Sequence, residues 1–170
     1  MTLQQLGDQE TELCLKTIEL ANQPQTQETR NKLEEICIEY KKIHQVYADL
    51  SFIEIEALKR GLFIQWYALS TAYWLSGIAE LNNESKNKVL NTLYQYIDLK
   101  KFDKELIWML NYYYTEWRWV FESWETFGGF DIAIVNDQNN ELPHIIDREA
   151  MKLRGQMGRY WNSLNVFNKP

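Results

Sequence analysis

The chain has 170 residues, of which 45% are hydrophobic and 25% charged, and its formal net charge is −6. Length and composition are typical of a globular protein with a sizeable core, so we expect one helical domain over residues 1–170. Few glycines and only three prolines argue against a turn-dense β fold. The acidic balance argues against nucleic acid as the main partner, because phosphate binding needs clustered Lys and Arg.

The cysteines and the apolar runs bear on compartment. Cys14 and Cys37 cannot build a disulfide scaffold and do not form a C-x-x-C pair. The first residues show neither the cationic nor the apolar region of a signal peptide. No apolar run reaches the roughly 20 residues that span a bilayer. We therefore expect a cytoplasmic protein with no membrane partner.

Charge is distributed unevenly along the chain. Residues 1–56 carry eleven acidic and five basic side chains, whereas residues 147–170 carry two acidic and five basic ones. One interpretation is that the two ends lie near each other and complement. The other is a dipole that steers a charged partner.

The N-terminal half predicts three helices. The first spans residues 8–22 with Asp8 as N-cap, in a segment, 1–24, that could lie at the periphery. The second, residues 26–48, is amphipathic at nearly heptad spacing. Ser51 and Glu54 have the spacing of a capping box and predict that the third helix starts at residue 52.

The third predicted helix, residues 52–69, is apolar on most of its sides and is therefore expected at the centre of the fold. Glu56 and Arg60 lie four residues apart and should pair. Lys59 and Arg60 form a basic dyad in this buried-looking helix. It is either a pair that snorkels toward Glu56 or an anion site.

The C-terminal half continues the helical pattern. We expect a packed connection over residues 70–83, then helices over 84–100, 104–127 and 147–165, capped by Asn83, Asp103 and Asp147. Residues 130–146 could form a small hairpin or an ordered loop. The fold class predicted is an all-α bundle of about six helices, with residues 52–69 and 104–127 at its centre.

The predicted helix 104–127 has two opposed apolar faces. One is an ordinary core stripe, and the other collects Trp108, Tyr112 and Trp119. If the helix lies between two layers, both faces are core. If the second face is exposed, its three aromatic residues form an interaction patch.

No constellation for catalysis, metal binding or nucleotide binding is present in the sequence. The only histidines are His44 and His144, too few for a di-iron or zinc site, and Glu141-x-x-His144 has no second copy. Phosphate-binding glycine loops and a G-x-S-x-G nucleophile motif are missing. We therefore predict no catalytic residues, no metal and no cofactor.

Part of the middle of the chain carries a resemblance. Residues 57–69 (ALKRGLFIQWYAL), followed by residues 74–81 (WLSGIAEL) and 106–114, resemble a group of uncharacterised bacterial helical proteins. The resemblance implies a bacterial cytoplasmic protein and nothing about activity.

Three functional hypotheses follow. The first is a non-catalytic protein-interaction protein, for example an immunity-type inhibitor that neutralises a basic bacterial toxin by charge complementarity. The second is a small-molecule binder or an unfamiliar enzyme, with a pocket between the two central helices and residues 70–83. That pocket would draw on Glu56, Arg60, Trp66, Trp74 and Tyr112. The third is self-association through Trp108, Tyr112 and Trp119.

Overall fold

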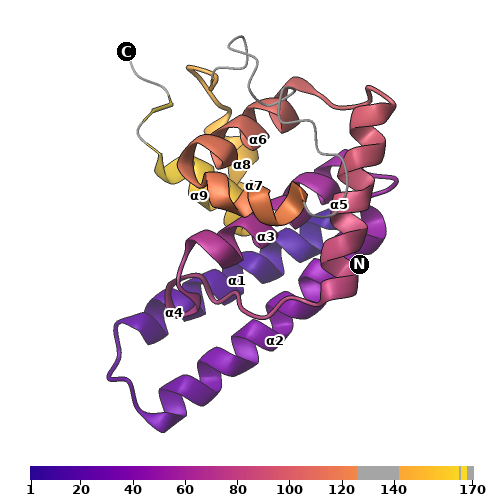
Figure 1. Cartoon of the computed structure of the whole chain (residues 1–170). Helices are drawn as coiled ribbons and strands as arrows, with labels where there is room; N and C mark the ends of the chain where they lie inside the picture. The colour runs from indigo at the N-terminus through magenta and orange to yellow at the C-terminus, as the bar shows by residue number, and fades with distance from the viewer. Residues whose placement is uncertain (126–141, 165, 168–170) are drawn as a thin grey trace.

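The computed structural model describes residues 1–125, 142–164 and 166–167, and these residues form helices and no strand. The all-α prediction is confirmed. The helices, labelled in Figure 1, are α1 (Leu3–Ala21), α2 (Gln27–Leu50), α3 (Ile55–Ser70), α4 (Tyr73–Ser76), α5 (Asn83–Asp98), α6 (Lys104–Glu116), α7 (Arg118–Glu125), α8 (Arg148–Lys152) and α9 (Gly155–Ser163).

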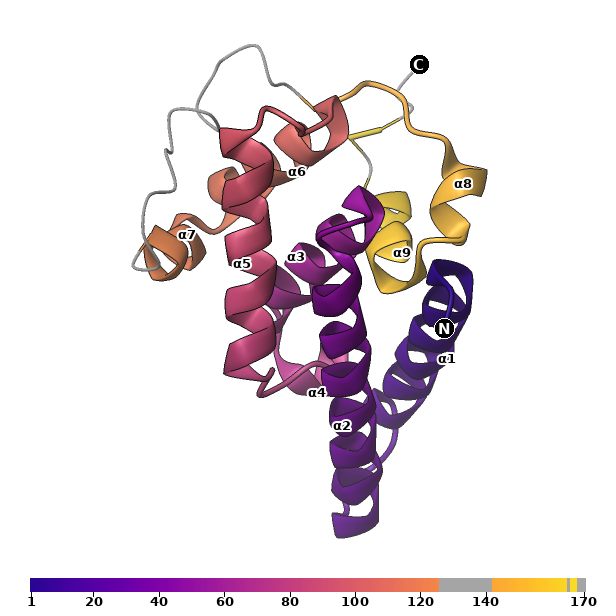
Figure 2. The same ribbon diagram turned by 90° about the vertical axis from the view of Figure 1, so that its right-hand side faces the viewer.

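Two helices organise the packing. α2 contacts α1, α3 and α5, and α3 contacts α4, α5, α7 and α9 as well as α2. Figure 1 shows α1 and α2 as a long antiparallel pair joined at one end of the molecule. Figure 2 shows α5 on one side of α3 and α9 on the other, with α9 lying beside α1. α1 contributes the fully buried Leu6, Glu10 and Thr17 to this packing.

The central position predicted for the third helix is confirmed. Every residue from Ala57 to Trp66 is buried, including the polar Lys59, Arg60 and Gln65. A helix that is buried on all sides must satisfy its polar side chains inside the protein. The partners of these three side chains define the candidate sites described below.

Local capping chemistry explains the helix starts. Asn82, and not the predicted Asn83, caps α5. The side chain of Thr2 accepts from Gln5 N and the Gln5 side chain accepts from Thr2 N, so α1 begins at Leu3 and not at Asp8. Asp8 lies within the helix and accepts from Gln4 Nε2 at 2.8 Å. Asp103 and Asp147 cap α6 and α8 as predicted.

The predicted capping box at Ser51 was wrong. Ser51 ends α2, and its buried hydroxyl donates to Ala48 O at 2.9 Å and lies 3.2 Å from Thr92 Oγ1. α3 therefore starts only at Ile55, after a turn that leaves Phe52 exposed. Ser51 has the helical φ −57° and ψ −31°, whereas an N-cap residue is extended, so its side chain is not placed to cap the next helix.

The predicted helix 104–127 is divided into α6 and α7. Trp117 adopts φ −144° and ψ 68°, which ends α6 after its amide donates to Tyr113 O. The break turns Val120, Phe121 and Trp124 into the core. The predicted end of this helix at residue 127 and most of the segment 130–146, expected as a hairpin or an ordered loop, lie outside the described residues.

The predicted helix 147–165 is also divided, into α8 and α9. Gly155 has φ +58°, a left-handed conformation that favours glycine. A Cβ on Gly155 would lie 2.7 Å from the carboxyl carbon of Glu10, and a Cβ on Gly158 would overlap the carbonyl of Met151. The glycines that weaken the sequence pattern of a single helix thus let α9 pack closely on α1 and α8.

Candidate functional site

A continuous network of charged side chains and one tyrosine joins four helices to the junction of α8 and α9, and we name it the charge network. Its members, in order of contact, are Glu10, Tyr47, Arg60, Glu56, Arg154, Glu105, Lys59 and Asp103. They come from α1, α2, α3, α6, the N-cap of α6 and the junction of α8 and α9.

Glu10 forms one end of the charge network and is 0% exposed. Its Oε1 accepts from the hydroxyl of Tyr47, and its Oε2 accepts from the backbone N–H of Gln156 at 3.2 Å. Burial raises the pKa of Glu10 to about 7, although the hydrogen bond from Tyr47 and the charge of Arg60 act in the opposite direction. Near neutral pH the protonated and the ionised form of this buried carboxyl are therefore both populated.

Arg60 and Glu56 continue the network along α3. The Nε of Arg60 donates to Glu56 Oε1 at 2.7 Å, which confirms the pairing predicted from their spacing. Arg60 Nη1 also donates to Leu3 O at 2.9 Å and to the Tyr47 hydroxyl at 3.3 Å. The guanidinium thus fixes the first turn of α1 against α2 and α3.

Arg154 bridges two carboxylates from different helices. Its Nε and Nη2 donate to the two carboxylate oxygens of Glu56 at 2.8 and 2.5 Å. Its Nη1 donates to Glu105 Oε1, and Nη2 lies 3.2 Å from Glu105 Oε2. This forked geometry is the one in which arginine binds carboxylates most strongly.

Lys59 and Asp103 close the network at the start of α6. Lys59 Nζ donates to Glu105 Oε2 at 2.5 Å and to Asp103 Oδ2 at 2.6 Å. Burial raises the pKa of Glu105, but the contacts with Arg154 and Lys59 outweigh this and hold it below its usual value. Since the Lys59 ammonium is already shared by two carboxylates, the observed contacts favour a structural pair over the anion site considered for Lys59 and Arg60.

An aromatic cluster lies beside the charge network, between α3, α6 and α9. Trp66 stacks on Tyr113 with ring centroids 4.5 Å apart, and Tyr160 contacts Trp66 edge-on at 5.3 Å. The hydroxyls of Tyr112 and Tyr160 are 2.7 Å apart and form a hydrogen bond. These aromatic side chains pack α3, α6 and α9 against one another.

The structure does not place Trp108, Tyr112 and Trp119 on one exposed face. Trp108 is only 8% exposed, and its ring packs on that of Trp161 with centroids 4.8 Å apart. Trp108 is therefore a core residue and not part of an exposed patch. Tyr112 is half-buried in the aromatic cluster. Trp119 lies on α7, beyond the break at Trp117, and is 46% exposed.

The residues of the predicted pocket are divided between three environments. Glu56 and Arg60 belong to the charge network, and Trp66 and Tyr112 contact each other in the aromatic cluster at 6.1 Å. Trp74 is half exposed on α4. A hollow does lie between α3, α7 and the 78–82 segment, but other residues line it.

Three consecutive apolar residues of α4, Tyr73, Trp74 and Leu75, form an exposed surface that we name the α4 patch. They are 43%, 50% and 55% exposed, and the rings of Tyr73 and Trp74 meet edge-to-face at 5.3 Å. The connection over residues 70–83 contains a helical turn, but its three largest apolar side chains are exposed and not packed on the core as expected.

The backbone under the α4 patch is fixed by buried contacts. Gly77 ends α4 at φ +74°, and a Cβ there would lie 2.5 Å from Thr17 Oγ1. Ser76 Oγ accepts from Ile78 N at 3.1 Å, and Ser76 O accepts from Gln156 Nε2 at 2.9 Å. The patch is therefore presented on a rigid turn wedged against α1 and α2.

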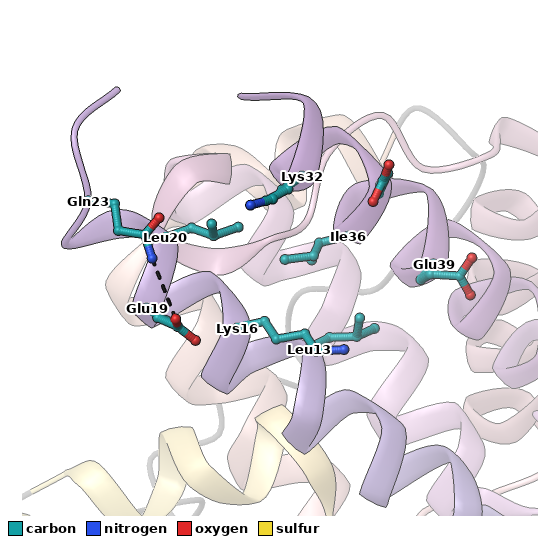
Figure 3. Close-up of a pocket in the computed structure, with 9 residues that line it drawn as sticks. Leu13, Lys16, Glu19, Leu20, Gln23, Lys32, Ile36 and Glu39 are labelled. Atoms are coloured by element: carbon teal, nitrogen blue, oxygen red, sulfur yellow. Dashed lines mark hydrogen bonds between the residues drawn. The ribbon is translucent and has the colours of Figure 1, made fainter. Parts of the chain in front are cut away.

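A shallow groove lies between α1 and α2 where the two helices diverge, with a volume of about 330 Å³ (Figure 3). Leu13, Leu20 and Ile36 form its apolar floor, and charged side chains form its walls. Two of those side chains, Lys16 and Lys32, already pair with carboxylates of their own helices. These two ammonium groups are therefore not free to bind a ligand in the groove.

The described part of the chain holds no group of three or more His, Cys, Asp or Glu placed to bind a metal ion. Within the same residues no helix has the length and hydropathy needed to cross a membrane. Cys14 and Cys37 are unpaired, and burial raises the pKa of both thiols.

Comparison with family models, curated proteins and solved structures found no match to this chain. The resemblance to bacterial helical proteins gains no support from this comparison and carries no argument below.

Proposed function

We propose that the protein is a non-catalytic binding protein of the cytoplasm that recognises a partner protein through the α4 patch. The observation that carries this proposal is the exposure of three consecutive large apolar side chains on a turn that buried contacts fix in place. Clustered exposed apolar groups mark interaction sites in folded proteins, and preorganised aromatic anchors reduce the entropy lost on binding.

Charge complementarity indicates a basic partner. The α4 patch is wedged against α1 and α2, because Gly77 at its end abuts Thr17 on α1 and Ile36 on α2. Apart from the buried Glu10, these two helices carry eight carboxylates and five basic side chains. This acidic surface beside an apolar anchor would steer and orient a basic protein.

An immunity-type inhibitor of a basic bacterial toxin is the concrete version of this proposal. The charge network supports a binding role over a catalytic one, because its carboxylates and cations are occupied by one another and Glu10 is fully buried. A side chain acts as a general acid or base only when it reaches its substrate.

The test compares two exposed tryptophans on different faces. Wild type, Trp74→Ser and Trp119→Ser are used as tagged baits in lysate of the source organism, and the recovered partner is then purified and titrated against each. We expect a basic protein that binds wild type and Trp119→Ser alike and Trp74→Ser about thirtyfold more weakly. Trp119 is the matched control because it is 46% exposed against 50% for Trp74.

Two results contradict the proposal. Equal affinity of the partner for wild type and Trp74→Ser would move the site away from α4, and loss of binding in Trp119→Ser alone would move it to α7. Sedimentation of the bait alone tests self-association. A wild-type dimer that Trp74→Ser converts to a monomer would show that the α4 patch binds a second copy of the chain instead.

A further inference from the structure

A second site lies at the meeting point of α2, α3, α5 and α7, away from the charge network. It is a hollow of about 780 Å³, bordered on one side by the 78–82 segment. Pockets of roughly 300–1,000 Å³ are the size that holds a small organic molecule. We name it the Lys41–Lys86 hollow after the two basic side chains in its lining.

The polar wall of this hollow is built on a buried amide. Gln65 is 2% exposed, and its Nε2 donates to Lys86 O at 3.2 Å and lies 3.1 Å from His44 Nε2. Burial lowers the pKa of His44 to about 4, helped by the charge of Lys86, so the imidazole is neutral at physiological pH and can accept from Gln65. Both amide hydrogens of Gln65 are thereby occupied, and its carbonyl oxygen remains for a ligand.

Two ammonium groups, those of Lys41 and Lys86, line the same hollow. Lys41 and Lys86 form no ion pair in the described part of the chain, whereas the exposed Lys88 on the same helix as Lys86 pairs with Asp49 at 2.7 Å. The one carboxylate in the described lining is that of Glu80, whose backbone adopts φ 45°. A non-glycine residue in the left-handed region is strained, and such strain gathers at binding sites.

Part of the lining is apolar, and Leu69, Leu90 and Trp124 contribute to it. Trp124 is fixed, because its ring contacts Phe121 at 4.8 Å and its carbonyl accepts from Tyr94 Oη at 2.8 Å. Leu90 and Trp124 are each only 3% exposed, whereas Leu69 is 45% exposed. Leu69 therefore offers the apolar surface that a planar or aliphatic body can bury.

We propose that the Lys41–Lys86 hollow binds a small organic anion with an apolar body. The anionic group contacts the ammonium groups of Lys41 and Lys86, and the body packs on the exposed side chain of Leu69. A hydroxyl or amine on the ligand donates to the carbonyl oxygen of Gln65. This proposal does not rest on the α4 patch and stands or falls separately from it.

The probe is naphthalene-1-acetate, titrated by calorimetry at neutral pH, with 1-naphthalenemethanol as the uncharged probe of similar ring and size. We expect saturable one-to-one binding of the acid and binding about tenfold weaker for the alcohol. Lys41→Gln and Lys86→Gln should each lower the affinity for naphthalene-1-acetate about tenfold and leave the affinity for the alcohol unchanged. Lys88→Gln is the matched control and should bind like wild type.

The affinity of the alcohol and the thermal midpoint of each variant report whether the hollow stays folded. A variant supports an anion site if it no longer binds the acid, still binds the alcohol with the wild-type affinity and has the thermal midpoint of the wild type. Absence of saturable binding of the acid up to about 10 mM, where even weak fragments bind measurably, overturns the proposal. Equal affinity for acid and alcohol, or an acid affinity that the Lys41→Gln/Lys86→Gln double variant retains, also overturns it.

Discussion

The hydroxyl of Tyr47 donates a hydrogen bond to the carboxylate of Glu10 at a place where both side chains are 0% exposed. Arg60 donates to the same hydroxyl at 3.3 Å, and Gln156 N donates to the other carboxylate oxygen at 3.2 Å. One carboxyl group therefore joins α1 to α2, α3 and α9. Its protonation is coupled to the packing of all four helices.

The first prediction concerns the pH dependence of stability. Because burial raises the pKa of Glu10 from 4.5 to about 7, the folded protein holds this proton more tightly than the unfolded chain. The stability from Glu10 is fully present below pH 4.5 and is lost as the pH rises toward 7. We expect this group alone to lower the free energy of unfolding by up to about 3 kcal/mol across that window.

The measurement is urea denaturation of wild type and Glu10→Gln at several pH values between 5 and 8. Glutamine keeps the shape of the carboxyl and cannot ionise, so the fall in stability with rising pH should largely disappear. Glu12→Gln, an exposed acid on the same helix, should keep the wild-type slope. If Glu10→Gln shows the wild-type slope, the coupling described above is wrong.

The second prediction concerns Gly155. Alanine at this position would have to adopt φ +58° and place its Cβ 2.7 Å from the Glu10 carboxyl carbon. We expect Gly155→Ala to lower the free energy of unfolding by about 2–4 kcal/mol, measured by urea denaturation. Gly61→Ala on α3 is the comparison, because its Cβ would meet the Val89 side chain at 3.2 Å and Tyr47 Cβ at an ordinary 3.6 Å. Equal losses in the two variants would contradict the close approach of α9 to α1.

The third prediction concerns Arg154. Arg154→Met leaves the carboxylates of Glu56 and Glu105 without their shared guanidinium and should cost about 3 kcal/mol of stability. Arg154→Lys keeps the charge but not the fork and should recover only part of that loss. Chemical denaturation at neutral pH measures both. Lys152→Met, which removes an exposed ion pair with Glu149, should have little effect. A loss for Lys152→Met as large as for Arg154→Met would refute the special role of the network.

The sequence predicts those parts of the structure that short-range chemistry decides. The pairing of Glu56 with Arg60 follows from their four-residue spacing, and the caps at Asp103 and Asp147 follow from side-chain oxygens before apolar helices. The burial of α3 follows from apolar residues on most of its sides. None of these needs knowledge of which helices meet.

The remaining contacts depend on tertiary packing. Glu10 and Arg154 looked like ordinary charges of acidic and basic segments, because their partners lie 37 and 98 residues away. The two ends of the chain do lie near each other. Arg154 donates to Glu56 on α3, and the backbone N–H of Gln156 donates to Glu10 on α1. The break at Trp117 has no local signal in the sequence, whereas the break before α9 falls at Gly155, whose left-handed φ favours glycine.

The same limit applies to the candidate sites. The apolar character of residues 73–75 indicated packing, yet Ser76, Gly77 and Ile78 supply the buried contacts and the larger side chains face outward. The periodicity around Trp108 was read on one straight helix, so it could not anticipate a buried Trp108 and an exposed Trp119. Exposure, which distinguishes an anchor from a core residue, is decided by tertiary structure.

The most direct test of the account is photo-crosslinking in cells of the source organism. A benzophenone amino acid replaces Leu75, which is 55% exposed beside Trp74, in one variant and Trp119 in another. We predict that position 75 crosslinks to one basic protein at high yield and that position 119 does not. A crosslink to that protein from position 119 alone, or no adduct from position 75, would contradict recognition through the α4 patch.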